Sequence, residues 1–288
     1  MRRRRLLTMR SLLCVPASQP KMVEKALTLD CDQIILDLED SVNPANKVAA
    51  RAYLKDFLST LDSQKRISLR INELTSSFSN ADIDLLCGLK SQSLSSVILP
   101  KIHSLDYVKS WAHKLPTEMQ LEVQIESAMG LIESTKIASH PQVISLAFGP
   151  ADFMASVGMP SSNPGTPWPE VSSALQWPLM QVVIAAHAHG KKAYDGPYFQ
   201  IADQVGLSRS THIGRALGVD GKWAIHPDQI ALINEAFTPS AEEIAMAQEI
   251  INTFNNSSGA VNFKGLMIDE ASKKVAEALL ERVKGFDK

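Results

Sequence analysis

The segment that decides the fold runs from Met119 to Asp152 and reads MQLEVQIESAMGLIESTKIASHPQVISLAFGPAD. Two apolar runs in it, Leu121 to Ile125 and Val143 to Phe148, have the length of buried strands. Between them, Met129 to Ser139 has the spacing of a helix. A strand, a helix and a second strand in this order predict a parallel βαβ unit whose strands are buried on both faces.

A carboxylate follows each of these two strands. Glu126 comes directly after the first strand, and Asp152 follows the second after the turn Gly149-Pro150. In parallel α/β folds, ligands bind outside the carboxyl ends of the strands. Two acids there would repel each other unless a cation held them, and a small number of oxygen ligands suits Mg²⁺, which keeps several waters. We therefore expect both acids to be Mg²⁺ ligands; the alternative is that they cap the helices that follow.

The alternation of strand and helix continues along the chain. Predicted strands are short β-rich runs at Ser11–Val15, Gln33–Leu38, Ile67–Ile71, Ser96–Pro100, Leu121–Ile125, Val143–Phe148, Lys192–Tyr194 and Lys222–Ile225. Predicted helices lie between them at Pro20–Leu29, Asn46–Leu61, Ala81–Leu89, Ser104–His113, Met129–Ser139, Ser173–His189 and Ile201–Leu217, and an eighth begins near Pro227. The Gly- and Pro-rich residues 158–168 are expected to form a loop on the ligand-binding face.

Eight βα units predict a closed parallel barrel of the α/β class, the (β/α)8 or TIM-barrel fold. The alternative is an open doubly wound sheet, but no GxGxxG motif follows the first strand and no P-loop motif is present. We assign residues 1–237 to the barrel, with a short basic N-terminal tail, and residues 238–288 to a C-terminal helical extension. In the extension, Ala241–Phe254 and Asp269–Val283 have helical patterns, and Val261–Ile268 is expected to be extended.

The composition bounds the function. At 288 residues with 45% hydrophobic residues, the chain can bury a substantial core. Its net charge of −2 provides no long-range field for nucleic acid or anionic lipid, and no apolar run is long enough for a membrane span. Its three cysteines have no CxxC spacing, which favours reduced residues. The expected protein is a cytoplasmic enzyme or binding protein.

Polar side chains also stand at the ends of other predicted strands. They include Asp37, Glu39 and Asp40 at the end of the second strand, Arg70 at the end of the third and Lys101 after the fourth. Each could be a helix cap or part of an ion pair, but a ring of such groups is costly to desolvate unless it binds a ligand. Arg70 can bind a carboxylate through two parallel hydrogen bonds, and the three acids could hold metal-bound waters or act as bases.

An ordered set of motifs resembles one known family. The stretches are RSLLCVPAS from Arg10, ILDLEDSV from Ile35, LRIN from Leu69, ILPKI from Ile98, QIESAMG from Gln124, AFGPADF from Ala147, DGPY from Asp195, DGKWAIHPDQI from Asp220 and FKGLMID from Phe263. In this order they resemble the citrate lyase β-subunit-like (CitE-like) acyl-CoA lyases of the HpcH/HpaI aldolase superfamily. The nearest likeness within that family is to bacterial citramalyl-CoA lyases.

The resemblance implies roles for the polar residues. Glu126 and Asp152 would bind Mg²⁺, and Arg70 would bind the carboxylate of the 2-oxo acid fragment. Asp37 and Glu39 would organise the water shell of the metal. Four further residues would contact the acyl-CoA: Lys21 and Lys25 at the CoA part, and Tyr194 and Asp195 along the acyl-CoA groove.

The C-terminal extension is expected to act in another subunit. The resemblance implies that Asp269 enters the active site of a neighbouring subunit and serves there as the catalytic acid. The polar linker 255–259 would allow this crossing, and the apolar residues of Val261–Ile268 need burial. A cyclic homo-oligomer, most simply a trimer, would meet both needs. The alternative is that the segment folds back over its own barrel and that Asp269 caps the last helix.

The predicted function is that of a Mg²⁺-dependent carbon–carbon lyase. We expect cleavage of a 3-hydroxy-3-carboxyacyl-CoA thioester, with (S)-citramalyl-CoA giving pyruvate and acetyl-CoA by a retro-Claisen reaction. Three alternatives stay open. The first is a malyl-CoA-type thioesterase, the second a free-acid aldolase, and the third a non-catalytic protein that binds an acyl-CoA or a keto acid.

Overall fold

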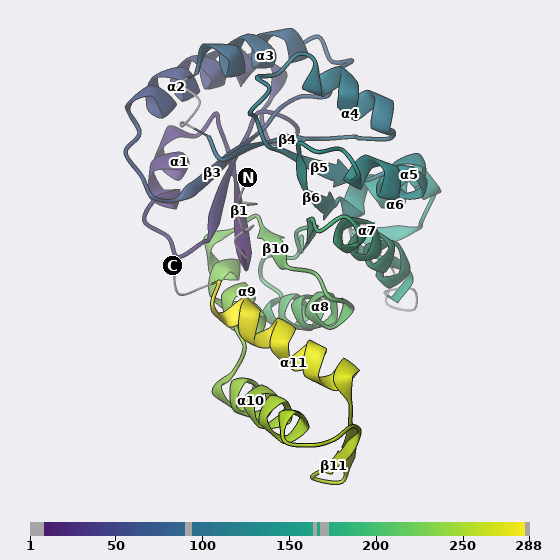
Figure 1. Ribbon diagram of the computed structural model, residues 1–288. Helices are drawn as coiled ribbons and strands as arrows, with labels where there is room; N and C mark the ends of the chain where they lie inside the picture. The colour runs from purple at the N-terminus through teal and green to yellow at the C-terminus, as the bar shows by residue number, and fades with distance from the viewer. Residues whose placement is uncertain (1–8, 90–93, 164–165, 168–172, 286–288) are drawn as a thin grey trace.

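The computed structural model describes residues 9–89, 94–163, 166–167 and 173–285, and these residues contain a closed parallel barrel (Figure 1). Its eight strands run in the spatial order β1-β10-β9-β6-β5-β4-β3-β2. The strands are β1 Ser11–Pro16, β2 Gln33–Asp37, β3 Arg66–Arg70, β4 Ser96–Leu99, β5 Leu121–Ile125, β6 Val143–Phe148, β9 Lys192–Asp195 and β10 Gly221–Ala224. The predicted α/β barrel is confirmed. The open-sheet alternative is excluded because β10 pairs with β1, with Ala224 opposite Leu13.

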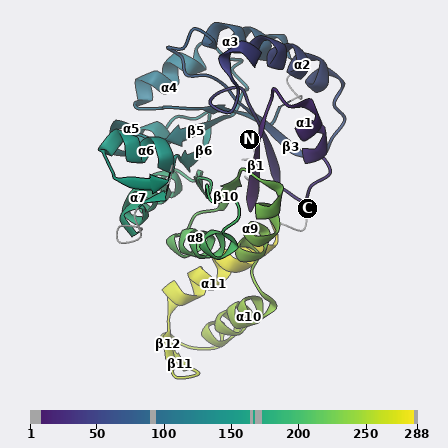
Figure 2. The same ribbon diagram turned by 180° about the vertical axis from the view of Figure 1, so that it is seen from behind.

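Helices surround the barrel on its outside (Figures 1 and 2). They are α1 Pro20–Ala26, α2 Lys47–Thr60, α3 Ser79–Gly88, α4 Leu105–Ala112, α5 Ala128–Ala138, α6 Pro150–Val157, α7 Gln176–Ala188, α8 Gln204–Leu217 and α9 Ile230–Phe237. The eighth helix does not continue directly from Pro227. A 3₁₀ turn, Pro227–Gln229, precedes α9.

Helix α6 was not predicted. It starts at Pro150, where the fixed φ of proline suits a first helical turn, and it ends at Gly158, whose φ is +68°. With eight residues it is too short to give a clear helical period in the sequence. The stretch expected as a loop contains two short antiparallel strands, β7 Ser161–Asn163 and β8 Thr166–Pro167. Residues 164, 165 and 168 of that stretch lie outside the described residues.

The inside of the barrel has layers of different polarity. A middle layer is apolar and consists of Met9, Leu12, Ile35, Ile98, Ala147, Tyr194 and Trp223. Toward the amino ends of the strands, the buried carboxylate of Glu122 accepts hydrogen bonds from Gln33, Ser68, Ser96 and Ser145. These hydrogen bonds offset the desolvation cost of burying the carboxylate of Glu122. The alternation of side chains along the strands does not by itself explain an acid at this position. The candidate site lies beyond the apolar layer, at the opposite, carboxyl ends.

The C-terminal arm, residues 241–283, extends away from the barrel in both ribbon views (Figures 1 and 2). It consists of α10 Ala241–Asn255, a hairpin of β11 Val261–Phe263 and β12 Leu266–Ile268, and α11 Glu270–Val283. Near the end of α11, Arg282 Nη2 donates to the carbonyl of Asp220 at 2.6 Å, and its guanidinium lies 5.3 Å from the ring centroid of Phe237. The arm is therefore anchored to the barrel at its last turn. Among the described residues, no helix has the length and apolar character to cross a membrane.

Candidate active site

A cavity of about 330 Å³ opens at the carboxyl ends of the strands. Its lining includes the two predicted metal ligands and the predicted carboxylate-binding arginine: Glu126 after β5, Asp152 in the first turn of α6 and Arg70 at the end of β3. The structure therefore brings together three residues that lie far apart in the sequence. Because each follows or ends a strand of one parallel barrel, all three lie at the same face.

Glu126 is held in place from several sides. It is 4% exposed; Oε1 accepts from the backbone N–H of Lys101 at 2.6 Å, and Oε2 accepts from Gln124 Nε2 at 3.2 Å. Gly149 lies against it so closely that a β-carbon there would be 2.5 Å from Oε2. Burial, together with the charges of Glu39 and Asp152, raises the pKa of Glu126 to about 8.

This donor set fits a hard divalent cation. Glu126 and Asp152 line one cavity, and the repulsion between them would be relieved by a positive charge between them. Within the described part of the chain, no three His, Cys, Asp or Glu side chains are grouped to bind a metal together. A site with two carboxylates suits Mg²⁺, which takes the rest of its ligands from water and substrate.

Asp37 pairs with Arg70 in the structure, and its predicted role at the water shell of a metal stays a prediction. Its two oxygens accept from Arg70 Nε and Nη2, each at 2.7 Å, and also from the backbone N–H groups of Glu39 and Ser41. Burial alone would raise the pKa of Asp37, but the neighbouring guanidinium outweighs it and lowers the pKa. Asp37 therefore fixes the orientation of Arg70.

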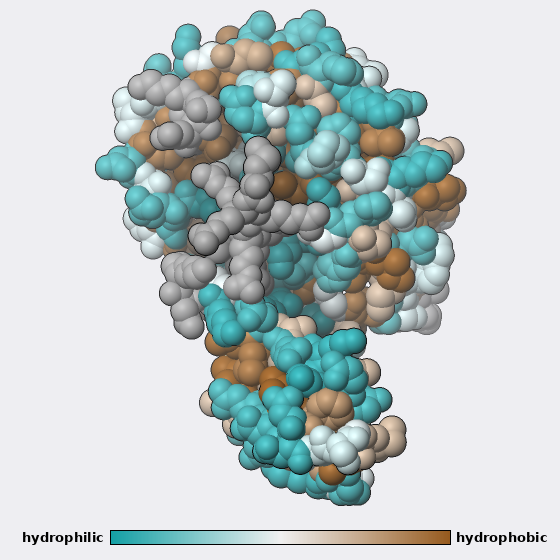
Figure 3. All heavy atoms as spheres, viewed as in Figure 1, coloured by the Kyte–Doolittle hydropathy of each residue, from teal (hydrophilic) through white to brown (hydrophobic). Residues whose placement is uncertain are grey.

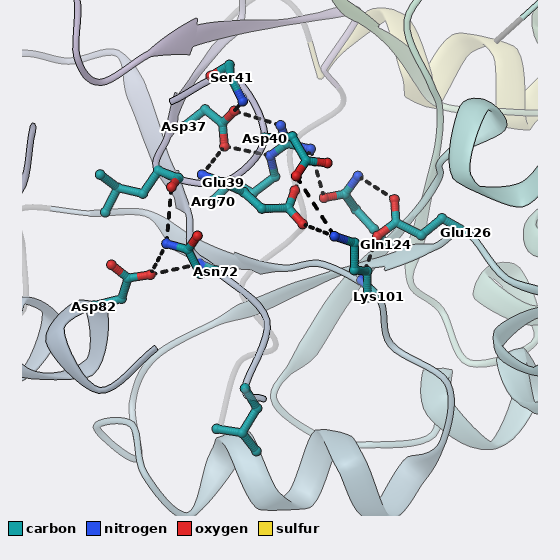
Figure 4. A network of polar contacts seen from close by, with 12 residues as sticks. Asp37, Glu39, Asp40, Ser41, Arg70, Asn72, Asp82, Lys101, Gln124 and Glu126 are labelled. Atoms are coloured by element: carbon teal, nitrogen blue, oxygen red, sulfur yellow. Dashed lines mark hydrogen bonds and ion pairs between the residues drawn. The ribbon is translucent and has the colours of Figure 1, made fainter. Parts of the chain in front are cut away.

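The remaining terminal nitrogen of Arg70 faces the site. Arg70 Nη1 lies 3.1 Å from Glu39 Oε2 and 3.5 Å from Gln124 Oε1. The other oxygen of Glu39 lies 3.2 Å from Lys101 Nζ, so Glu39 bridges two cations (Figure 4). Burial raises the pKa of Glu39 to about 7, against the opposing effect of Arg70. Nη1 is thus positioned to bind an anionic ligand.

A second polar network supports the loop that carries Glu39. Lys47 Nζ donates to the carbonyls of Leu38 and Glu39 at 2.6 and 2.7 Å and to Asn72 Oδ1 at 2.8 Å. Asn72 in turn donates to Asp82 Oδ2 at 2.7 Å (Figure 4). Lys47, Gln124 and Gly149 are functional residues that the sequence reasoning missed. Of these, Gly149 had a signal, since it stands between a strand end and the proline that starts a helix.

The predicted groove residues Tyr194 and Asp195 lie elsewhere. Tyr194 is 0% exposed within the apolar layer of the barrel, so its side chain does not line a surface groove, and that prediction is corrected. Its position in β9 points it inward because it alternates with Asp195. Asp195 faces outward, pairs with the buried Lys222 and lines a second cavity of about 280 Å³. Neither is among the described residues that line the first cavity.

The other predicted contact residues are exposed or remote in the single chain. Lys21 and Lys25 are exposed on α1, which follows the carboxyl end of β1. Asp269 caps α11 by accepting a hydrogen bond from the backbone N–H of Ser272 at 3.0 Å. The alternative prediction, in which Asp269 caps the last helix and the segment folds back over its own barrel, therefore agrees with the structure in the cap. The segment does not fold back over its own barrel, because the arm extends away from it (Figure 1).

The fold and the site define a barrel enzyme with an acidic, arginine-containing pocket. The sequence pattern of the HpcH/HpaI aldolase/citrate lyase family matches residues 10–227, and the chain belongs to this family. An L-malyl-CoA/beta-methylmalyl-CoA lyase of Cereibacter sphaeroides is 33% identical over 292 residues, covering 93% of this chain and 92% of the relative. A (3S)-malyl-CoA thioesterase of the same organism is 33% identical over 249 residues, covering 86% and 84%.

A solved structure gives the same result. The protein CitE from Mycobacterium tuberculosis, crystallised with magnesium, acetoacetate and coenzyme A, matches with a TM-score of 0.82 at 30% identity, covering 97% of this chain and 99% of that one. The resemblance to CitE-like proteins and the predicted enzyme class, an oxo-acid lyase, are confirmed. The likeness to citramalyl-CoA lyases in particular stays a prediction.

Proposed function

We propose that the chain is a Mg²⁺-dependent acyl-CoA lyase that cleaves (S)-citramalyl-CoA to pyruvate and acetyl-CoA. The observation that carries the proposal is the meeting of Glu126, Asp152 and Arg70 Nη1 at one cavity. Two carboxylates and one oriented guanidinium are the groups needed to hold a substrate with a carboxylate and an adjacent hydroxyl. The magnesium in the CitE complex and the names of the relatives support this chemistry.

Each residue then has a defined task. When bound, Mg²⁺ would polarise the carboxylate and hydroxyl oxygens of the substrate. Arg70 Nη1 binds the substrate carboxylate, and Asp37 acts through Arg70 by fixing its plane. The hydroxyl proton passes to solvent water in the open cavity, and the ketone of pyruvate forms as the carbon–carbon bond breaks. The electron pair of that bond passes to the α-carbon of the acetyl thioester, which then takes up a proton.

Asp269 of a neighbouring subunit supplies that last proton. The arm has exposed apolar side chains, with Leu266 at 64% and Met267 at 74% in the hairpin and Val275 at 72% in α11, which favours burial against another subunit. Figure 3 shows the arm as a narrow lobe that projects from the barrel. Asp269 stands at the start of α11, the end opposite to Arg282, which anchors the helix to the barrel, and this favours a role in a neighbouring site. A cyclic trimer closes such a head-to-tail contact with the fewest subunits above two. Residues 238–288 are therefore proposed to complete the neighbouring active site.

Mixed oligomers test this shared site. Asp269→Asn and Glu126→Gln proteins should each be nearly inactive, because each lacks one part of every site. Co-expressed hybrids should recover part of the activity, since some sites draw an intact Asp269 and an intact Glu126 from different chains. Purification through two different tags ensures that only mixed oligomers are assayed. Inactive hybrids would contradict the shared site without affecting the assignment of the metal ligands.

A thioesterase is the second candidate, because a malyl-CoA thioesterase is as similar in sequence as the malyl-CoA lyase. Incubation with Mg²⁺ and a panel of citramalyl-CoA and malyl-CoA stereoisomers, followed by mass analysis, separates the two. A lyase releases acetyl-CoA and a 2-oxo acid, whereas a thioesterase releases free CoA and the intact hydroxy acid. Lys21→Ala combined with Lys25→Ala should raise KM for the CoA ester in either case, since both cations are proposed to contact the CoA part.

A further inference from the structure

Lys101 has an unusual backbone at the edge of the metal site. Its φ is +54°, and among the described residues the other non-glycine residue with positive φ is Lys264, at +50°. Lys264 lies in the exposed turn of the β11–β12 hairpin, where a left-handed residue is ordinary. Lys101 instead follows Pro100 at the end of a barrel strand, where left-handed backbone is unfavourable for a side chain of its kind and marks a position fixed by its surroundings.

The left-handed turn places both ends of Lys101 in the site (Figure 4). Its backbone N–H donates to Glu126 Oε1 at 2.6 Å, the shortest of the contacts that hold this carboxylate. Its side chain extends in another direction, and Nζ lies 3.2 Å from Glu39 Oε1 and 3.9 Å from Asp40 Oδ1. The residue that follows, Ile102, is 0% exposed, so the turn is held by the core on its far side.

We propose that Lys101 is a positioning residue that serves two separate parts of the site. Its strained N–H fixes the carboxylate of Glu126 for metal binding, and its ammonium fixes Glu39 behind Arg70 Nη1. This inference rests on the proposed function, because it takes from it the metal, Mg²⁺, and the 2-oxo acid, pyruvate. A hydrogen bond to a metal-ligating carboxylate sets its orientation, and loss of such partners commonly weakens metal binding.

The ammonium has a separate consequence for the 2-oxo acid. Glu39 lies between Lys101 Nζ and Arg70 Nη1, and it is 5% exposed, so few waters can replace a lost cation. Without the ammonium, Glu39 would turn more fully toward Arg70 and compete with a bound carboxylate for Nη1. Metal binding and 2-oxo acid binding should therefore depend on different atoms of the same residue.

Three substitutions separate the effects. Replacement of the Lys101 backbone amide by an ester, through the corresponding α-hydroxy acid, removes only the N–H donor. Lys101→Met removes only the charge, because methionine keeps a similar length and the same backbone preference. Lys101→Gly removes the charge and also relieves the backbone, because glycine adopts positive φ freely. The same ester at Lys264 is the matched control in a turn far from the site.

Calorimetry with Mg²⁺ alone tests the backbone. The ester at Lys101 should weaken Mg²⁺ binding by roughly 10- to 100-fold, the range seen when outer partners of metal ligands are removed. The Lys264 ester and Lys101→Met should bind Mg²⁺ within about threefold of the wild type, since they keep the N–H. Unchanged Mg²⁺ affinity in a folded Lys101 ester would overturn the backbone role. Lys101→Gly should also unfold at a higher temperature than Lys101→Met, and the reverse order would contradict the strain.

Titration of the Mg²⁺-loaded protein with pyruvate tests the side chain. Lys101→Met and Lys101→Gly should bind pyruvate roughly tenfold more weakly, whereas Lys101→Arg should keep most of the affinity. Wild-type affinity for pyruvate in Lys101→Met would overturn the role of the ammonium. If the wild-type protein binds Mg²⁺ but not pyruvate, the proposed substrate and the role of the ammonium are refuted. The role of the backbone N–H is then still decided by the Mg²⁺ affinity of the Lys101 ester. If the wild-type protein does not bind Mg²⁺, the proposed function and this inference both fail.

Discussion

Gly149 lies beside the carboxylate of Glu126, and its substitution gives the sharpest test of the metal site. A β-carbon at position 149 would lie 2.5 Å from Oε2 and 2.6 Å from Cβ of Glu126, whereas ordinary contacts begin at about 3.4 Å. Gly149→Ala must therefore displace the Glu126 side chain by about 0.9 Å. Metal–ligand distances tolerate only about 0.2 Å, so the altered carboxylate cannot hold the ion in its former position.

The expected loss follows from this displacement. A shift of about 1 Å in a reacting group commonly costs on the order of 100-fold in rate, or about 2.7 kcal/mol of transition-state stabilisation. We expect kcat/KM on the CoA ester to fall by roughly 100-fold and Mg²⁺ affinity, measured by calorimetry, to fall at least tenfold. The melting temperature should also fall, because Cβ of Glu126 is fixed to the backbone and cannot move away from the new methyl group, so Mg²⁺ binding is measured well below the melting transition of the variant. Gly88→Ala is the control, since a β-carbon there meets nothing within 4 Å. Mg²⁺ affinity equal to that of Gly88→Ala would refute the reasoning.

Three further predictions concern the same site. Arg70→Lys keeps the charge but cannot span both oxygens of Asp37, so pyruvate affinity should fall by about 2–5 kcal/mol with acetyl-CoA affinity little changed in calorimetry; unaltered pyruvate binding would exclude Arg70 as its ligand. Lys47→Met leaves the carbonyls of the Glu39 loop unpaired and should lower the free energy of unfolding in urea by about 3 kcal/mol; a loss below about 0.5 kcal/mol would show that water replaces the ammonium. Burial, with Glu39 and Asp152, raises the pKa of Glu126 from 4.5 to about 8 in the metal-free protein, so its contribution to stability is complete below about pH 4.5 and is lost as the pH rises through about 8. Mg²⁺ binds the ionised carboxylate, so the increase in melting temperature that it causes should grow from pH 5 to pH 8 in the wild type but not in Glu126→Gln.

The strands could be predicted because a parallel barrel buries them on both faces. Leu121–Ile125 and Val143–Phe148 have the predicted bounds in the structure, and the acids after them line one cavity. This much follows from the sequence because the carboxyl ends of parallel strands must share a face. Helix α6 was missed because its eight residues give too short a pattern, although the Gly149-Pro150 start was visible.

Pairing across strands could not be predicted. Asp37 and Arg70 are opposite each other in the register of β2 and β3, and this register places the acid where it orients the guanidinium. Nothing in either local sequence specifies it. The inward direction of Tyr194 was likewise missed, because a strand of four residues that is buried on both faces has no polar alternation to indicate which side chains face the interior.

Closure of the barrel has a consequence for biosynthesis. The partner of Leu13 in β10 is Ala224, about 210 residues later in the chain. At roughly 5–20 residues per second, a ribosome needs roughly 10–40 s to make that partner available. Throughout this interval one edge of the apolar strand SLLCVP has no hydrogen-bonding neighbour, and such an edge is a template for association with other chains. We expect the yield of folded protein in cells to depend on chaperones that bind this first strand, and truncation before residue 221 to give aggregated chains.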